Sequence, residues 1–303
     1  MNAKNYRTKF IEVLEPIHGI DEAESFFYLI LEDKHQMKRI DLALEPNFEF
    51  SEEAINVWEE LVFQLKKEIP IQYLLENTEF FGLPFIVNES VLIPRPETEE
   101  LVDWIIKEER KGERLKDGKI EGQKNEKIEE KKDLKILDIG TGSGCIAISL
   151  AKNIPHAQVF AIDVSPEALK VAKSNAEQNN VSVTFLEKDI LQTEGFLQQF
   201  DIIVSNPPYV RNLEKQEIKN NVLEYEPHLA LFVEDLDALI FYRKITHLAT
   251  KNLNDGGQLF FEINQYLGKE MIQLLSEFGF SDIELKQDIY GNDRMTRAVW
   301  KKK

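Results

Sequence analysis

The chain has 303 residues and a formal net charge of -17, and 43% of its residues are apolar, which allows one large domain or two modest ones with a buried core. Such acidity argues against broad nucleic-acid binding, and the single cysteine, Cys145, excludes an internal disulfide and fits a reducing cytoplasm. The N-terminus lacks a signal-peptide core and no apolar run reaches the roughly 18 residues of a membrane span, so neither secretion nor membrane insertion is expected.

Residues 1–75 are predicted to form a helical domain. Asp21 and Glu24 have the spacing of a capping box ahead of an apolar run that begins at Phe26. Ser51 is placed to cap a second long helix, which carries Trp58 among its apolar residues. No glycine-rich loop or metal-ligand cluster occurs in this stretch. A small helical bundle is the simplest interpretation, and a bundle that also binds a partner is the functional alternative.

Residues 76–303 are expected to form a second domain. Its first part, residues 78–93, places aromatic-rich runs on either side of a Gly-Leu-Pro sequence, which predicts a β-hairpin that links the two domains. Residues 107–133 contain ten Lys or Arg and nine Asp or Glu but few large apolar residues. Such a segment cannot bury enough surface to offset its ordering entropy, so it is predicted to be a solvated, flexible insertion, partly helical or disordered.

From Leu134 onward, predicted strands and helices alternate along the chain. Strands are predicted at 135–139, 158–163, 182–187, 200–204 and 257–263, with 283–285 and 298–300 as a closing pair. Helices are predicted at 144–153, 166–179, 236–253 and 266–279. This alternation predicts a doubly wound α/β fold with a mostly parallel, seven-stranded, Rossmann-like sheet covered by helices on both faces. In such a sheet, ligands bind at the carboxyl ends of the strands.

A glycine-rich turn follows the first of these strands, in the sequence KILDIGTGSGCIA. Gly140, Gly142 and Gly144 allow a tight turn and a close approach of backbone to ligand, ahead of a helix N-terminus. The dinucleotide pattern G-x-G-x-x-G fails because position 145 is Cys. The G-x-G-x-G spacing after an acidic residue instead resembles an S-adenosylmethionine site. Cys145 itself is interpreted as a packed helix residue rather than a nucleophile.

Acidic residues at the next two strand ends support this interpretation. Asp163 ends the second strand, where a carboxylate can accept hydrogen bonds from both hydroxyls of a ribose. Asp189 follows the third strand and can accept from the adenine amino group, with Ile190 against the ring. The glycine turn, Asp163 and Asp189, taken together and in this order, are more specific for S-adenosylmethionine than any one of them. Each alone can occur on an unrelated doubly wound sheet.

The fourth strand ends in SNPPYV. The side-chain oxygen of Asn206 and the carbonyl of Pro207 are two acceptors, which match the two hydrogens of a planar NH2 group. Pro207 and Pro208 stiffen the loop before the substrate arrives, and Tyr209 can stack on a planar group. This arrangement suits methyl transfer to a conjugated nitrogen, because it orients the nitrogen lone pair and stabilises the growing positive charge. The alternative is a simple strand-ending turn.

Several longer stretches resemble one family. PIQYLLENTEFFGLPFIVNESVLIPRPETEELVDWI at 70–105, above all VLIPRPETEELV, is similar to the PrmC/HemK family of peptide-chain release factor glutamine methyltransferases. YEPHLAL at 225–231 and YGNDRMT at 290–296 resemble late motifs of that family. The resemblance covers all but the first few residues and the charged insertion.

The resemblance implies a cytoplasmic transferase that moves a methyl group from S-adenosylmethionine to the amide nitrogen (N5) of a glutamine. That glutamine lies in the Gly-Gly-Gln loop of class I release factors, which the helical domain and hairpin would help to bind. The implied cofactor residues are Gly140, Thr141, Gly142, Ser143, Gly144, Asp163, Asp189, Ile190 and Asn206. The implied glutamine-binding residues are Asn206, Pro207, Pro208 and Tyr209, of which Asn206, Pro207 and Tyr209 are catalytic. No metal, stable nucleic-acid binding or membrane contact is expected.

Two departures and three alternatives stand beside this prediction. The family usually has glycine after QYLL, where this chain has Glu76, and the charged insertion is long for the family. The roles of Arg95 and Glu97 are open between an ion pair that fixes the loop and a part in shaping the cavity. The alternatives are an amino methyltransferase acting on nucleic-acid bases, one acting on a glutamine of a ribosomal protein, and an inactive cofactor-binding protein.

Overall fold

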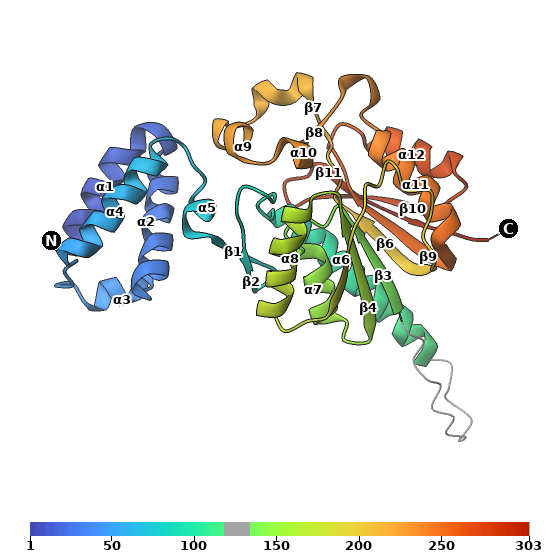
Figure 1. The fold of residues 1–303 in the computed structure, drawn as a ribbon, viewed down its shortest axis with the longest axis horizontal. Coiled ribbons are helices and arrows are strands. Elements are labelled where there is room, and N and C mark those ends of the chain that lie inside the picture. Colours follow the sequence, from blue (N-terminus) through green and yellow to red (C-terminus); the bar gives the residue numbers. More distant parts are fainter. Residues whose placement is uncertain (118–133, 303) are drawn as a thin grey trace. The chain divides into compact units, whose positions relative to one another are not determined.

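The computed structural model describes residues 1–117 and 134–302, which form two compact units (Figure 1). The first unit comprises Met1–Asn77 together with Ile218–Tyr225, and the second comprises Thr78–Glu217 and Glu226–Lys303. A short segment that follows the NPPY sequence therefore belongs to the helical unit, although the chain on both sides of it belongs to the second unit.

The longer elements of the first unit are all helices, as predicted. Its helices are α1 (Ala3–His18), α2 (Ile20–His35), α3 (Arg39–Leu44), α4 (Glu52–Leu65), α5 (Ile71–Leu75) and α9 (Asn220–Tyr225). Trp58 is fully buried at the centre of this bundle, where its ring lies against Phe10 and Phe27. The Tyr225 hydroxyl donates to the Lys67 carbonyl oxygen at 2.8 Å, which attaches α9 to the bundle.

One of the two predicted helix caps in this unit is correct. The Ser51 hydroxyl accepts a hydrogen bond from the Ala54 N–H at 3.2 Å, as expected for the cap of α4. The predicted capping box of Asp21 and Glu24 is wrong. Gly19, at φ +81°, ends α1, and α2 begins directly at Ile20 without a side-chain cap. Asp21 therefore lies inside the first turn, and Glu24 accepts from the Arg7 guanidinium at 2.7 Å instead.

The predicted hairpin consists of β1 (Asn77–Phe80) and β2 (Leu83–Ile86), with Phe80 and Phe85 buried. It is attached to α8 (Pro166–Gln178) by the fully buried side chain of Asn175. Asn175 accepts from the Ile86 N–H at 2.6 Å and donates to the carbonyl oxygens of Ile86 and Ser143, both at 2.9 Å. One amide side chain thus joins the hairpin to the glycine turn.

The second unit is built on a seven-stranded sheet in the order β10-β11-β9-β6-β3-β4-β5. Its strands are β3 (Leu134–Ile139), β4 (Ala157–Asp163), β5 (Val183–Glu187), β6 (Phe200–Ser205), β9 (Leu253–Glu262), β10 (Ser281–Gln287) and β11 (Asp293–Val299). The pairs among β5, β4, β3, β6 and β9 are parallel, and β11 is antiparallel to both of its neighbours. The predicted doubly wound fold is confirmed.

Helices cover both faces of the sheet. One face packs against α6 (Pro96–Asp117), α7 (Cys145–Asn153) and α8, and the other against α11 (Ile240–Asn252) and α12 (Gly268–Glu277). Shorter elements connect them: β7 (Val210–Arg211), η1 (Asn212–Glu217), α10 (His228–Leu231), β8 (Phe232–Val233) and η2 (Asp235–Asp237). The predicted helix 236–253 begins later, at Ile240, because the 3-10 helix η2 occupies its first residues.

The charged segment predicted as an insertion at 107–133 begins within α6, which continues to Asp117. The remainder of that prediction, residues 118–133, lies outside the described residues. Within the described part of the chain, no helix combines the length and the apolar character needed to cross a bilayer.

Glu76 ends α5 in the left-handed conformation, at φ +56°, where the family resemblance anticipates glycine. The turn is therefore kept, although a residue with a Cβ is strained in this conformation.

Glu76→Gly is expected to raise the free energy of unfolding by about 1 kcal/mol, measured by denaturant unfolding followed by circular dichroism. Glu59→Gly, at an exposed position inside α4, is the matched control and should lower it by a similar amount. Equal effects of the two substitutions would contradict this explanation.

Candidate functional site

A cavity of about 280 Å³ opens at the carboxyl ends of the strands, beside the neighbouring parallel strands β3 and β6. After β3 the chain continues to β4 on one side, and after β6 it continues toward β9 on the other side. Doubly wound folds bind their ligands at such a point, where the strand order reverses. Most of the lining surface is apolar, and a few polar groups face it. The lining includes Gly140, Thr141, Gly142, Ser143, Asp163, Asp189, Ile190, Asn206, Pro207 and Pro208. Nearly all of the predicted site residues are thus brought to one cavity.

The glycine turn needs glycine for two different reasons. Gly140 and Gly142 have φ values of +74° and +54°, and a Cβ at either would meet no atom within 4 Å. Their backbone therefore faces open space. Gly144, at φ +83°, does not line the cavity, and a Cβ there would lie 2.9 Å from Cδ1 of Ile148 and 3.2 Å from Cβ of Ala172. Gly144 thus permits the close packing of α7 on α8, while the other two glycines leave room for a ligand.

Two carboxylates hold the turn. The Gly142 N–H donates to Asp163 at 2.8 Å, and the other Asp163 oxygen accepts from the Ser165 N–H at 2.9 Å. Asp138 lies fully buried beneath the turn and accepts from the Thr141 hydroxyl at 2.6 Å, while its second oxygen has no hydrogen-bond partner among the described residues. Burial raises the pKa of Asp138 to about 7, and the nearby negative charge of Asp163 adds to the rise.

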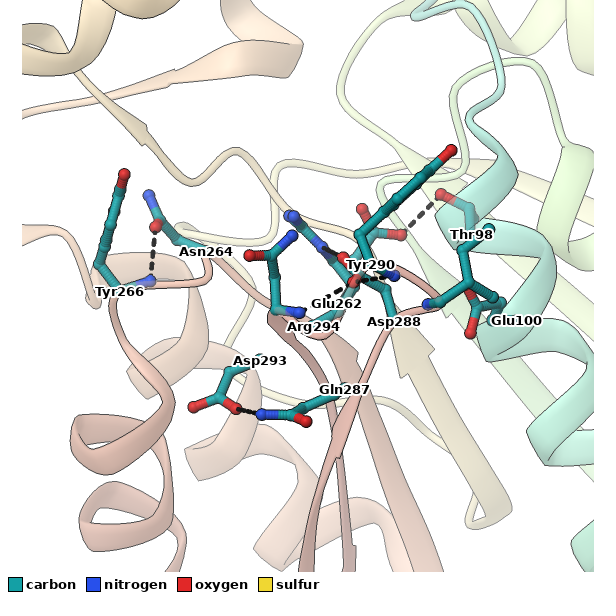
Figure 2. Close-up of polar contacts among 12 residues, drawn as sticks. Thr98, Glu100, Glu262, Asn264, Tyr266, Gln287, Asp288, Tyr290, Asp293 and Arg294 are labelled. Atoms are coloured by element: carbon teal, nitrogen blue, oxygen red, sulfur yellow. Dashed lines mark hydrogen bonds and ion pairs between the residues drawn. The ribbon is translucent and has the colours of Figure 1, made fainter.

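Asn206 is half-buried at the edge of the cavity, and its orientation is set by a neighbour from another element. Its Nδ2 donates to the hydroxyl oxygen of Thr98, in the first turn of α6, at 3.3 Å. The Thr98 hydroxyl in turn donates to Glu262, the last residue of β9, at 2.6 Å (Figure 2). The side-chain carbonyl oxygen of Asn206 is thereby left as an acceptor.

Tyr209 does not line the cavity. Its hydroxyl donates to the second carboxylate oxygen of Glu262 at 3.3 Å, and its backbone carbonyl accepts from Asn264 at 3.1 Å. Burial and the charge of Glu262 raise the pKa of Tyr209 well above its usual range, so the hydroxyl remains a neutral donor. Tyr209 is thus fixed at both its hydroxyl and its backbone.

Arg95 pairs with Glu226 rather than with Glu97. The Arg95 guanidinium donates to the buried Glu226 carboxylate at 2.6 Å, and the second Glu226 oxygen accepts from the Ile93 N–H at 3.2 Å. Arg95 lines one wall of the cavity, and Pro227 lines another. The ion pair ties the loop of Arg95 to the segment around Glu226, and Arg95 also lines the cavity, so both roles that the sequence left open for Arg95 remain compatible with the structure.

Two families of known proteins match the chain in sequence. The PrmC N-terminal domain matches residues 8–75, and the methyltransferase small domain matches residues 125–229. A release factor glutamine methyltransferase from Flavobacterium psychrophilum is 62% identical over 298 residues, covering 98% of this chain and 99% of the relative. One from Bacteroides thetaiotaomicron is 42% identical over 286 residues, covering 94% and 95%. The chain belongs to the release factor glutamine methyltransferase family.

Solved structures agree with the methyltransferase fold. The crystal structure of the hMettl16 catalytic domain, in complex with MAT2A 3′UTR hairpin 6, superposes on this family member with a TM-score of 0.51 at 18% identity. The match covers 73% of this chain and 76% of that chain. At this identity the likeness concerns the fold alone.

The late segment YGNDRMT of this methyltransferase forms the β10–β11 turn and the start of β11. Asp288 is buried and accepts from the N–H groups of Tyr290 and Asn292, both at 3.0 Å, and from the Arg294 guanidinium at 3.1 Å (Figure 2). Burial raises the pKa of the Glu262 carboxyl, and the nearby positive charge of Arg294 offsets part of this rise. By contrast, Arg297 pairs with Glu108 and Glu284, so its role is structural.

Thr98 and Glu262 are the site residues of this methyltransferase that the sequence analysis missed. A signal existed for Glu262, because it lies one residue before the end of the predicted strand 257–263, while Asp163 ends the predicted strand 158–163. Thr98 lies within the family motif PRPETE, but nothing in its spacing indicates a contact with a residue 164 positions away. Cys145 is buried as predicted, and burial raises the pKa of its thiol to about 12, which excludes a thiolate nucleophile at neutral pH.

The burial of Asp138 leads us to expect that the free energy of unfolding depends on pH. Its folded pKa of about 7 lies above the unfolded value of about 3.9, so the folded state binds the extra proton between these values. This contribution to stability is complete below about pH 4 and is lost as the pH rises through about 7. Asp138→Asn keeps an oxygen for Thr141 but cannot ionise.

Denaturant unfolding of the Asp138→Asn variant and the unchanged protein at several pH values tests this. The variant's stability relative to the unchanged protein should rise between about pH 4.5 and 7 and then level off. A difference that stays constant over this range would show that Asp138 titrates normally.

Proposed function

We propose that this protein transfers a methyl group from S-adenosylmethionine to the side-chain amide nitrogen (N5) of the glutamine in the Gly-Gly-Gln loop of class I peptide-chain release factors. Family membership over nearly the full length supports the activity, since the relative from Flavobacterium psychrophilum is 62% identical over 98% of this chain. The observation that carries the proposal at the level of the site is Asn206, which offers a carbonyl oxygen at the edge of the cavity beside the glycine turn.

The residues of the cavity fit the cofactor. Gly140 and Gly142 leave open space where side chains would otherwise stand, and Thr141 and Ser143 complete that wall. Asp163 is positioned for the ribose hydroxyls, although its oxygens also hold the turn, since each carboxylate oxygen has a second lone pair. Asp189 and Ile190 are positioned for the adenine, and Gly144 acts indirectly through the packing of α7. When bound, the cofactor supplies an electrophilic methyl group on a sulfonium centre.

Asn206 and Pro207 hold the substrate amide. The side-chain oxygen of Asn206 and the carbonyl oxygen of Pro207 each accept one N–H of the glutamine carboxamide, which turns the nitrogen lone pair toward the methyl donor. The two acceptors also stabilise the positive charge that grows on nitrogen during transfer. Pro207 and Pro208 restrict the loop, so the acceptors are fixed before binding. Tyr209 was expected to stack on the amide, but it lies outside the cavity lining. In this proposal it therefore acts indirectly: anchored through its hydroxyl, it fixes the loop that carries Asn206 and Pro207.

The two parts of the chain have different tasks in this proposal. Residues 1–75, together with α9 of the same compact unit, serve for substrate recognition. The rest of residues 76–303 form the methyltransferase domain, and its hairpin region 78–93 contributes to release-factor binding. The net charge of -17 disfavours a phosphate-rich substrate and favours a protein one. The enzyme acts in the cytoplasm, where its class I release-factor substrates take part in translation termination.

Asn206→Ala is expected to lower the rate of methylation by about 10²-fold or more, because it removes a preorganised acceptor for the substrate amide. The rate is measured from the mass of the Gly-Gly-Gln peptide released by proteolysis of the release factor. Because the resemblance also counts Asn206 among the cofactor residues, the rate is measured at saturating S-adenosylmethionine, whose dissociation constant is determined by calorimetry. A loss of less than about threefold would remove Asn206 from the catalytic role.

Asp163→Asn tests the cofactor site separately. An amide has one oxygen, so it can accept from either the Gly142 N–H or the Ser165 N–H but not from both, and it lacks the charge that strengthens a hydrogen bond to ribose. The dissociation constant for S-adenosylmethionine should rise about tenfold or more while the circular dichroism spectrum is unchanged. Unaltered affinity would remove the assignment of Asp163.

The choice of substrate is tested by offering labelled S-adenosylmethionine with release factor, ribosomal proteins, rRNA and DNA in parallel. Label in the release factor, lost when its Gly-Gly-Gln glutamine is replaced by glutamate, is the expected result. Label in nucleic acid or in a ribosomal protein, with none in release factor, would overturn the proposed substrate.

A further inference from the structure

Thr98 and Glu262 form a buried polar contact directly behind Asn206. The two residues are 2% and 1% exposed, and they come from the first turn of α6 and the end of β9. Burying a carboxylate is costly unless hydrogen bonds compensate for the lost water. Here the compensation comes from two hydroxyls. One is that of Thr98, which also contacts Asn206 (Figure 2 shows its bond to Glu262), and the other is that of Tyr209, the last residue of the NPPY segment.

The direction of each hydrogen bond in this contact follows from the chemistry of its members. The Thr98 hydroxyl donates its single hydrogen to Glu262 at 2.6 Å, so that hydrogen is not available to Asn206. The Thr98 oxygen can then only accept from its other neighbour, Asn206. The NH2 group of Asn206 must therefore face Thr98, and its oxygen must face away from it.

Glu262 also holds Tyr209, the last residue of the NPPY segment. Its second oxygen accepts the hydroxyl hydrogen of Tyr209, and Arg294, itself held by Asp288, places a positive charge near the carboxylate. One buried carboxylate thus controls both Asn206 and Tyr209.

We propose that Glu262 and Thr98 are positioning residues that hold Asn206 with its oxygen toward the substrate, and that this orientation selects a carboxamide over a carboxylate. The inference rests on the proposed function for the identity of the substrate amide. When its oxygen faces the substrate, Asn206 accepts a hydrogen bond from the NH2 group of glutamine and repels the oxygens of glutamate. With the amide reversed, Asn206 would donate and would favour glutamate, which cannot be methylated on nitrogen.

Thr98→Val tests the proposal because it removes the hydroxyl and preserves the shape of the side chain. Asn206 then loses the acceptor that fixes its NH2 group. The kcat is expected to fall about tenfold or more, with the dissociation constant for S-adenosylmethionine within about twofold of the unchanged protein. A release factor carrying Gly-Gly-Glu should become a stronger inhibitor, so that its inhibition constant falls relative to the KM for the Gly-Gly-Gln release factor. A purely structural defect would not change this ratio.

Two further variants separate positioning from packing. Thr98→Ser keeps the hydroxyl and should retain kcat within about threefold. Thr246→Val makes the same change at another fully buried threonine, in α11, whose hydroxyl has no hydrogen-bond partner among the described residues, and should leave kcat unchanged. Equal losses in Thr98→Val and Thr98→Ser, or no loss in Thr98→Val, would overturn the proposal.

Glu262→Gln provides an independent second test. A glutamine offers one oxygen, so it can accept from either Thr98 or Tyr209, and its NH2 group would compete with Asn206 for the Thr98 oxygen. The kcat should fall by at least as much as in Thr98→Val, and the double variant should lose less than the product of the two single losses, since both act through Asn206. Independent, multiplicative effects would contradict a shared route.

Failure of the proposed function has a different signature. If the unchanged protein methylates nucleic acid or a ribosomal protein instead of release factor, the substrate assignment fails. The orientation of Asn206 can still be tested on that other substrate, by the ratio of the kcat of Thr98→Ser to the kcat of Thr98→Val. A ratio near one would overturn the positioning role, and a ratio of about tenfold would support it.

Discussion

The parallel hydrogen bonding of β3 to β4 on one side and to β6 on the other is the constraint on which the site depends. Parallel strands end at the same edge, so Ile139, Asp163 and Ser205 are brought together although they lie far apart in sequence. The Ser205 hydroxyl donates to the Ile139 carbonyl oxygen at 2.7 Å, and the N–H groups of Gly140 and Thr141 donate to the Ile162 carbonyl oxygen. These bonds close the strand ends around the cavity and leave the glycine turn and Asn206 facing it.

Buried carboxyl groups are the second common feature of this edge. Asp138, Glu226 and Glu262 are each nearly inaccessible to water, and each supports a segment that lines the cavity. Asp138 holds Thr141, Glu226 holds Arg95, and Glu262 holds Thr98. Such groups are costly to bury when they lack partners, which makes them weak contributors to stability but effective in selecting one arrangement of loops. Their concentration here is consistent with a preorganised site.

The chain also shows how local strain can be retained without loss of the turn. Glu76 adopts the left-handed conformation at the end of α5, where a glycine would relieve the strain. Gly144 shows the opposite case, because both its φ of +83° and the approach of Ile148 exclude a side chain. A turn at the surface can tolerate a non-glycine residue, whereas one pressed between two helices cannot.

The sequence by itself determined the alternation of strands and helices, the glycine turn, the residues at each strand end and, through its long motifs, the family. These features are local: a strand period, a glycine spacing or a short motif is contained within one stretch of chain. Even there, the boundaries of α11 and the start of α2 were displaced, because neighbouring turns and Gly19 decided where the helices begin.

Only the tertiary structure decided which charged and polar side chains meet. Thr98 and Glu262 are 164 residues apart, Arg95 and Glu226 are 131 apart, and Asn175 lies 89 residues from the hairpin that it holds. Any of the many carboxylates in the chain satisfies the same local pattern. Which one is buried beside a given hydroxyl or guanidinium depends on the packing of α6 against the sheet and of the loops over it, and the physical reason is that hydrogen bonds act over a few ångströms of space rather than along the sequence.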